Sequence, residues 1–468
     1  MKHRYHLKPW ELRWQKSLRN FKHSKVGLFL LRRIPESVLS KIPYEAIPLW
    51  IASVLTGVVS VFYEKLFTWF EESGEHFFEV HPATIFITAP VFIFGGWWLV
   101  QRFSPEAAGS GIPQLMAAVN SAGTRRRSVV DYLLNIRVIL VKIGSSLLIL
   151  LGGGAIGREG PTLQISGSIF QVVYRLIPES WPKVSHKIML ITGGASGLAA
   201  AFNTPLGGIV YVVEELTKSH IGKFRTAVFS AVIISGMTAQ LFLGSYLYLG
   251  FPKVNPLPLL SILWVILFAF LSGVLGSLFS KTLLKIAEFR SLIRKPATKI
   301  LIVLVFAFAF ATLVYFTGKY TMGTGKPLIN EILFGTKPMP WYMFPARFLG
   351  AVLTFAVGGA GGIFATSLSS GASLGTLLVS IFSIAKEQHN ILVLVAMIGF
   401  LTGVTKSPFT AAILVLEMTD RHSAIFYFLL AGLVANFGSS LIMDRSFYEI
   451  RKEDYLKSTL SKIKSPNQ

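Results

Sequence analysis

The sequence of 468 residues contains no cysteine, which excludes disulfides, thiolate metal sites and cysteine nucleophiles. Its nine histidines are scattered without the spacing of metal ligands, so no metal site is predicted. No nucleophile, base and orienting residue stand in a recognisable arrangement. These absences argue against an enzyme and against any cofactor.

The sequence also contains no complete nucleotide-binding motif. Gly152, Gly154 and Gly157 satisfy the spacing G-x-G-x-x-G, but a run of membrane length precedes them instead of a soluble βαβ context. The segment from Gly323 to Lys326 lacks the upstream glycine and the following Ser or Thr of a phosphate loop. Neither segment is predicted to bind a nucleotide.

Charge is scarce, because only 15% of the residues are charged while 52% are hydrophobic and stand in long blocks. This pattern predicts an all-α, polytopic membrane protein, in which several apolar runs are too short or too glycine-broken to cross a bilayer of about 30 Å simply. Alternating apolar and polar residues, typical of strands, do not appear. The candidate spans are residues 46–67, 83–100, 129–151, 188–213, 227–243, 259–279, 300–316, 348–357, 391–404 and 424–442.

The net charge of +22 comes mainly from basic clusters at residues 2–33, 125–127 and 445–464. Such clusters in tails and short loops favour the cytoplasm, which predicts a multi-pass protein of the inner (plasma) membrane with both termini cytoplasmic, and no nucleic-acid binding. Residues 1–45 lack the pattern of a signal peptide. They are predicted to form a cytoplasmic, basic interfacial helix, with Trp10 and Trp14 on one face.

An internal repeat organises the apolar region. The glycine-rich segment at residues 153–157 recurs at 358–362, and Pro205 with an apolar run to Glu214 recurs as Pro408 with a run to Glu417, in both cases about 205 residues later. We therefore expect a first membrane repeat at 46–250, a second at 251–445, and a C-terminal helix and cytoplasmic tail at 446–468. Chance recurrence of glycine-rich and proline-started helices is the alternative explanation.

Three glycine-rich segments are predicted to open helices inside the membrane, at residues 109–113, 157–161 and 361–365. A helix that begins there directs unpaired N–H groups and about half a positive charge at whatever precedes it, which makes an anion site without lysine or arginine. Glu159 lies in one of these segments. An intramembrane acid is costly and usually faces a cavity, pairs with another group or lies on an ion or proton pathway.

Together these segments resemble the CLC family of chloride channels and chloride/proton antiporters. The resemblance rests on Gly109-Ser110-Gly111-Ile112-Pro113, Gly157-Arg158-Glu159-Gly160-Pro161, Gly362-Ile363-Phe364-Ala365 and Tyr448, in this order and spacing. It covers residues 46–448 and implies a homodimer in the lipid bilayer, with one pore per subunit built from two inverted repeats with broken and re-entrant helices.

The resemblance also implies the site. The hydroxyls of Ser110 and Tyr448 and the backbone N–H groups of Ile363 and Phe364 would hold a chloride ion, the substrate. A serine at position 110 resembles the chloride-preferring members rather than the nitrate or fluoride transporters. The helix starts that would surround the anion contribute Gly109, Gly111, Gly157, Arg158, Gly160 and Gly362.

The resemblance assigns roles to two glutamates, and the second of them favours an antiporter over a channel. Glu159 corresponds to the external gate and proton acceptor, which competes with chloride, and Glu215 corresponds to the internal proton-transfer residue. The resulting prediction is a chloride/proton antiporter. A passive CLC-type chloride channel is the alternative, followed by a transporter of another monovalent anion such as fluoride or nitrate. Glu214 and Glu417 occupy equivalent repeat positions and are predicted to be structural.

One residue departs from the family pattern. The family's G-x-F-x-P motif here ends in Thr366 instead of proline. Proline presets the first turn of a helix, and threonine can supply a cap or an additional hydroxyl instead. We expect the helix start to be retained. The anion affinity or selectivity can still differ from that of family members with proline.

Overall fold

The structure is a computed structural model that describes residues 46–123, 127–177, 184–216, 225–244, 247–255, 258 and 261–464. The predicted N-terminal interfacial helix with Trp10 and Trp14, and most of the triple-arginine loop, lie outside the described residues. The helices in the first half are α4 (Ile47–Val80), α5 (Ile85–Phe103), α6 (Ile112–Ser121), α7 (Arg127–Leu133), α8 (Ile136–Leu151), α9 (Glu159–Leu176), α10 (His186–Phe202), α11 (Pro205–Tyr211) and α12 (Arg225–Leu243). Those in the second half are α13 (Ile262–Leu292), α14 (Pro296–Thr317), α15 (Lys326–Phe334), α16 (Met343–Val357), α17 (Phe364–Ile381), α18 (His389–Thr405), α19 (Pro408–Thr419), α20 (Ile425–Ser440) and α21 (Phe447–Lys464).

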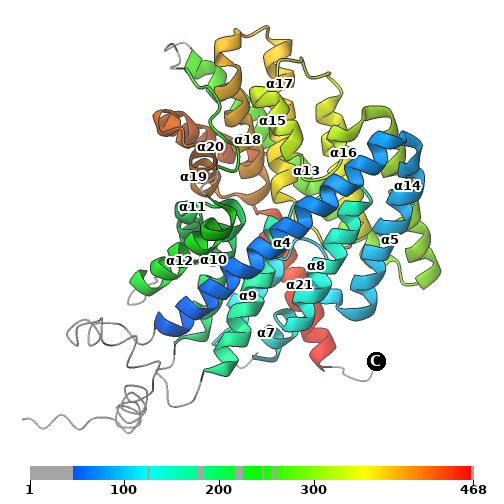
Figure 1. Cartoon of the computed structure of the whole chain (residues 1–468), viewed down its shortest axis with the longest axis vertical. Coiled ribbons are helices and arrows are strands. Elements are labelled where there is room, and N and C mark those ends of the chain that lie inside the picture. The colour runs from blue at the N-terminus through cyan, green and yellow to red at the C-terminus, as the bar shows by residue number, and fades with distance from the viewer. Residues whose placement is uncertain are drawn as a thin grey trace, which may run out of the picture.

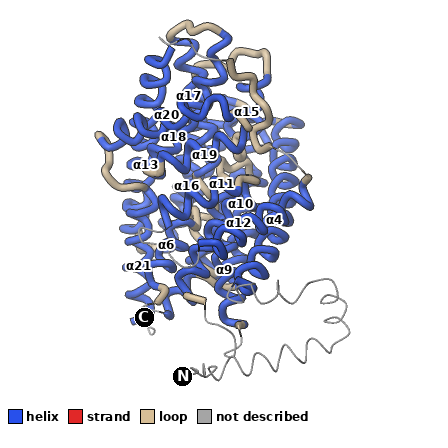
Figure 2. The backbone as a smooth tube through the Cα atoms, turned by 90° about the vertical axis from the view of Figure 1, so that its left-hand side faces the viewer, coloured by secondary structure: helices blue, strands red, loops and turns tan. Residues whose placement is uncertain are grey.

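The predicted all-α membrane architecture is confirmed. Within the described part of the chain, nine helices are long and apolar enough to cross a membrane, and no strand occurs (Figure 2). With 34 and 31 residues, α4 and α13 are longer than predicted. At about 1.5 Å per residue, each exceeds a hydrocarbon core of about 30 Å. Such helices tilt or extend past the bilayer, and α4 runs obliquely across the molecule (Figure 1).

Two predicted spans are broken in the structure. The run at 129–151 divides at Asn135, whose side-chain oxygen accepts a hydrogen bond of 3.0 Å from Val138 N and starts α8. The run at 188–213 divides at Asn203, which adopts a left-handed conformation (φ 57°) and ends α10 before Pro205 opens α11. Asparagine as a cap and proline at a first turn are the physical reasons for these breaks.

The backbone geometry of the two halves matches residue for residue at the segments that repeat in sequence. Gly153 and Gly358 have φ values of 78° and 79°. Asn203 and Lys406, which precede the two proline-started helices, have φ values of 57° and 59°. Chance recurrence of glycine and proline does not produce equal left-handed positions in both halves, so the structure favours a true repeat.

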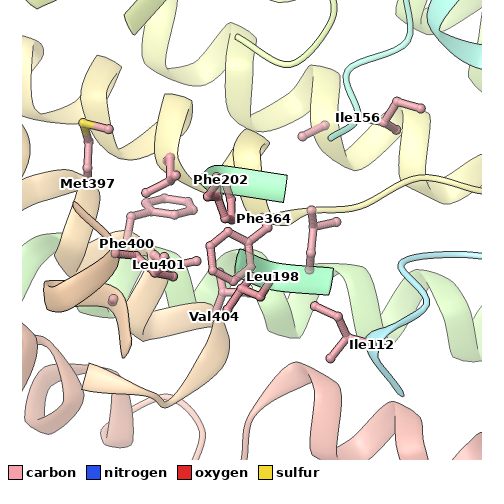
Figure 3. Packing of buried hydrophobic residues seen from close by; sticks show 14 of the residues in the cluster. Ile112, Ile156, Leu198, Phe202, Phe364, Met397, Phe400, Leu401 and Val404 are labelled. Atoms are coloured by element: carbon pink, nitrogen blue, oxygen red, sulfur yellow. The ribbon is translucent and has the colours of Figure 1, made fainter. Parts of the chain in front are cut away.

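The two repeats are arranged head to head around the middle of the molecule. Helices α9 and α17 start close together and extend to opposite ends, α9 toward the end where α21 and the C-terminus lie (Figure 1). Between them, α10 and α18 are almost entirely buried. Their side chains, including Leu198, Phe202 and Phe400, pack around Phe364 at the start of α17 (Figure 3). This rigid packing fixes where the helix starts point.

Candidate functional site

The three glycine-rich segments meet at one place, as predicted. Gly157 and Gly362 exchange two backbone hydrogen bonds of 2.8 Å, so the starts of α9 and α17 are joined directly. Gly109 N donates to Gly359 O at 2.7 Å, and Gly361 N donates to Gly109 O at 3.1 Å. Segments far apart in the sequence therefore form one backbone cluster.

Glycine is required at this meeting point because the chains approach closely. A Cβ at Gly111, where φ is 100°, would lie 2.8 Å from Gly160 O. A Cβ at Gly160 would lie 2.7 Å from Ser110 O, and one at Gly362 would lie 3.0 Å from Gly157 O. Side chains at these positions would push the helix starts apart, since real Cβ atoms do not approach backbone oxygens so closely.

The carboxylate of Glu159 is fully buried at the start of α9. Its Oε2 atom lies directly over Gly157, beside the backbone nitrogen of Ala365 in the first turn of α17. The amides of Glu159 and Ala365 both face the carboxylate. The carboxyl group of Glu159 thus lies at the N-terminal ends of two helices, where the helix dipoles favour a negative charge.

Two buried hydroxyls from other elements lie beside the start of α9. Ser110 Oγ is the side-chain atom nearest to Gly160, and Ser110 and Tyr448 are neighbours whose side chains are 2% and 0% exposed. Neither hydroxyl has a hydrogen bond of normal geometry within the described part of the chain. Buried hydroxyls without partners usually mark a place where a ligand or water binds.

The start of α17 supplies further donors. Ile363 is the N-cap and Phe364 the first helical residue, and the first bond within the helix runs from Ser367 N to Ile363 O at 3.0 Å. The N–H groups of Ile363 and Phe364 consequently have no acceptor in their own helix. Thr366 retains this helix start, as expected. Its hydroxyl donates to Ile363 O at 3.1 Å and is therefore engaged within α17.

The charge of Arg158 is neutralised within the protein. The guanidinium of Arg158 forms an ion pair of 2.6 Å with Glu64 of α4 and donates to Ala201 O at 3.2 Å. Arg158 contributes its backbone to the helix start, while its charge is engaged by Glu64. No group of His, Asp or Glu within the described ranges is arranged to hold a metal ion.

Lys142 is a site residue that the sequence analysis missed. It is fully buried in α8 and donates hydrogen bonds of 2.8 Å to Ala107 O and to Gly109 O. These bonds fix the segment that carries Ser110. A single lysine within the apolar run at 129–151 was the available signal, since a charge there requires a partner.

A cavity of about 280 Å³ lies beside Ser110 and is lined by residues of α13, α14 and α21. Its walls include Gly109, Ser110 and three basic residues, Arg290, Lys299 and Arg451. Tyr455, also in its wall, donates from its hydroxyl to Ala108 O at 3.0 Å. The basic lining makes the electrostatic potential of the cavity favourable for anions.

Glu215 is not part of this cluster. It lies in a π-helical turn, η4 (Val212–Leu216), and lines a separate pocket of about 150 Å³ with Lys187 and Lys452. Ser407 Oγ donates to Glu215 Oε2 at 2.8 Å. Tyr211, four residues earlier, has a buried hydroxyl with no hydrogen-bond partner among the described residues. The pocket of Glu215 and the basic cavity share no residue.

The neighbouring acids Glu214 and Glu417 have the predicted structural role. Glu214 accepts from Phe409 N at 3.1 Å and from Thr410 N at 2.6 Å, at the start of α19. Glu417 accepts from the backbone nitrogens of the equivalent positions in α11, at 3.0 and 2.6 Å. Each repeat therefore caps a helix of the other, which locks α11 against α19.

Comparison with known proteins places the chain in a family. The model of the voltage gated chloride channel family matches residues 85–440, well over half of the chain. Among solved structures, a slow cyanobacterial Cl⁻/H⁺ antiporter is similar with 23% identity and a TM-score of 0.75, over 89% of this chain and 98% of that one. A CLC-type fluoride/proton antiporter matches with 20% identity and a TM-score of 0.73, over 90% and 99%.

A eukaryotic CLC transporter matches with 20% identity and a TM-score of 0.73, over 90% of this chain and 75% of that one. At these identities the structures establish a common fold. The extent of the family match and the glycine-rich helix starts agree on the class of protein, which is a membrane channel or transporter and not an enzyme. The chain belongs to the CLC family, the voltage gated chloride channels.

Proposed function

We propose that the protein is a chloride/proton antiporter. The observation that carries this proposal is the buried carboxylate of Glu159, docked on the backbone amides where α9 and α17 begin. Those amides and the hydroxyls of Ser110 and Tyr448 are groups that bind an anion. An ionisable side chain that occupies such groups competes with the anion.

This competition couples the two ions. When Glu159 is deprotonated, its carboxylate takes the place of an anion at the helix starts. When Glu159 is protonated, it loses most of its attraction to the helix dipoles and leaves the amides to chloride. Because the deprotonated carboxylate and chloride exclude each other at this place, protonation of Glu159 favours chloride binding, and chloride binding favours protonation of Glu159.

Glu215 is the proposed internal proton-transfer residue. Its pocket, with Lys187 and Lys452, is separate from the basic cavity that reaches Ser110. Two separate openings at one end of the molecule suit a transporter in which protons and chloride enter by different routes. Within this proposal, that end is cytoplasmic, in agreement with the basic residues of α21 and the expected plasma-membrane location.

Chloride is the proposed substrate because the cage contains neutral donors only. Amides and hydroxyls bind a monovalent anion loosely enough to release it. The hydroxyl of Ser110 supports chloride over nitrate or fluoride by resemblance. Thr366 adds no free donor, since its hydroxyl is engaged by Ile363 O.

The protein is further proposed to be a homodimer. Large apolar side chains are exposed on α11, α12, α19 and α20, which lie on one side of the molecule (Figure 1). They include Leu206, Leu241, Phe409, Phe426 and Phe437, whose exposed fractions range from 48% to 82%. A second copy of the same face would cover this surface around a twofold axis.

Flux measurements in liposomes test the antiporter directly. With purified protein in the membrane, an imposed chloride gradient is expected to drive protons uphill. Glu159→Ala removes the competing carboxylate and is expected to abolish proton movement while chloride flux continues. Glu215→Gln is expected to reduce proton movement and to leave chloride flux in place.

Other outcomes identify other functions. Chloride flux in the wild type that moves no protons would establish a passive channel instead. Exchange of fluoride or nitrate in preference to chloride would overturn the proposed substrate while leaving the proton-coupled mechanism. Organic-anion exchange without chloride flux would overturn both.

A further inference from the structure

The loop between α12 and α13 brings a tyrosine against the carboxylate of Glu159. Tyr248 is 4% exposed, and its hydroxyl donates to Glu159 Oε1 at 3.4 Å. The loop is fixed beside the site, because Leu249 N donates to Met418 O at 3.0 Å and Gly250 N donates to Leu247 O at 3.2 Å. The contact with Glu159 therefore comes from an anchored segment.

The tyrosine ring is held on two sides. The ring of Phe202 meets it edge-on, with centroids 5.2 Å apart and an interplanar angle of 83°. The ammonium of Lys326, the first residue of α15, lies 4.6 Å from the ring centroid. The ring of Phe202 also packs against that of Phe364, with centroids 5.3 Å apart. Figure 3 shows these two rings side by side. The tyrosine, the end of α10 and the start of α17 therefore form one packed unit.

The two carboxylate oxygens of Glu159 have different surroundings, and Oε2 has no hydrogen bond of normal geometry among the described residues. Oε2 lies over Gly157 beside Ala365 N, and Oε1 faces the hydroxyl of Tyr248. A phenol donates a stronger hydrogen bond to a carboxylate than to a neutral carboxylic acid. The cation over the ring face is attracted to it and restrains the ring where the hydroxyl can reach Oε1.

We propose that Tyr248, positioned by Phe202 and Lys326, is a clamp that holds the deprotonated Glu159 on the helix starts. It thereby strengthens the carboxylate in its competition with chloride and slows the opening of the gate. Tyr248 acts through Glu159 and is a positioning residue. This inference rests on the proposed gating role of Glu159.

The variant Tyr248→Phe tests the clamp, because it keeps the ring contacts with Phe202 and Lys326 and removes only the donor. Chloride binding is measured by titration calorimetry on the full-length protein in detergent, at one fixed pH. We expect chloride to bind about three- to tenfold more tightly, the range for loss of one ordinary hydrogen bond, because the contact of 3.4 Å is long. Chloride flux in liposomes is expected to rise as well.

Two comparisons make the test specific. In a Glu159→Gln background, Tyr248→Phe is expected to leave chloride affinity unchanged, because no charged carboxylate remains to be held. The matched control is Tyr63→Phe, which removes another buried phenol, one paired with Ser146 Oγ at 2.7 Å, and is not expected to tighten chloride binding.

An unchanged or weaker chloride affinity in Tyr248→Phe would overturn the clamp. An equal gain in the Glu159→Gln background would also overturn it, since the effect would then bypass the carboxylate. Failure of the antiporter proposal is seen separately, as wild-type flux without proton movement. The binding comparison remains decisive in that case, because it requires only that Glu159 and chloride compete.

Discussion

At the scale of single residues, the site contains buried cations that do not face the anion cage as free charges. Arg158 is paired with Glu64, and Lys142 is directed at the carbonyls of Ala107 and Gly109. A free cation inside the cage would hold chloride too tightly for release, whereas amides and hydroxyls do not. The buried charges therefore shape the backbone that binds the anion.

Lys142→Met tests this indirect role. The substitution keeps the length of the side chain and leaves two buried carbonyl groups without their donor, at a cost of about 1–3 kcal/mol each. The segment that carries Ser110 is expected to shift, and chloride affinity is expected to fall by about tenfold or more. Calorimetric titration with chloride measures the change.

Lys281→Met is the control, because Lys281 lies exposed on α13. It removes the same charge from the protein and is expected to leave the affinity unaltered. Equal losses in both variants would mean that overall charge, and not the two bonds of Lys142, determines chloride affinity.

Sequence patterns predicted those site residues whose role depends on local backbone. Helix starts at glycine-rich segments were readable because glycine and proline signals act over a few residues, and α6, α9 and α17 begin where predicted. Tyr248 and Lys142 were missed, since their partners are 89 and 33 to 35 residues away and only the folded chain brings them together.

At the scale of helices, glycines determine how closely two elements pack. The pair α5 and α8 is the clearest case, because adjacent glycines of α5 differ in their surroundings. A Cβ at Gly96 would lie 2.8 Å from Ser145 O, whereas a Cβ at Gly95 would have its nearest neighbour at 3.7 Å. Ser145 Oγ in turn donates to Gly96 O and accepts from Ala360 N, which links this helix pair to the glycine cluster.

Gly96→Ala is therefore expected to destabilise the protein by about 1–3 kcal/mol through overpacking. It is also expected to weaken chloride binding, since Ser145 would move relative to Ala360. Gly95→Ala has room for its methyl group and replaces a helix-weakening glycine, so it is expected to be neutral or stabilising by up to about 1 kcal/mol. Thermal unfolding in detergent and chloride titration of the two variants provide the comparison.

If Gly95→Ala lost as much stability as Gly96→Ala, close contact between α5 and α8 would not be the reason for the loss of stability in Gly96→Ala.

The breaks that divide predicted spans also belong to the scale of helices. Asn135 and Asn203 end or start helices inside apolar runs, and hydropathy averaged over a run does not detect one capping residue. That the elements are helices was thus more predictable than where each helix begins and ends.

At the scale of the whole molecule, the repeat explains why one side remains apolar. The reciprocal caps from Glu214 and Glu417 lock α11 to α19, and α12 and α20 flank them on the same side (Figure 1). Residues from both repeats thus form one continuous face. The opposite side, with α5 and α14, presents apolar side chains of the kind that lipid covers.

Cysteine crosslinking distinguishes a protein partner from lipid at these two faces, because the chain has no cysteine of its own. Leu206→Cys, Phe409→Cys and Phe437→Cys each place one thiol on the proposed interface, and Phe316→Cys places one on α14, where the side chain is 76% exposed.

Around a twofold axis, a residue near the axis meets its own copy. We expect a bismaleimide to give covalent dimers with at least one of the first three variants and none with Phe316→Cys, as resolved on denaturing gels. Dimers from Phe316→Cys alone would move the interface to the opposite side, and monomers throughout would contradict the homodimer.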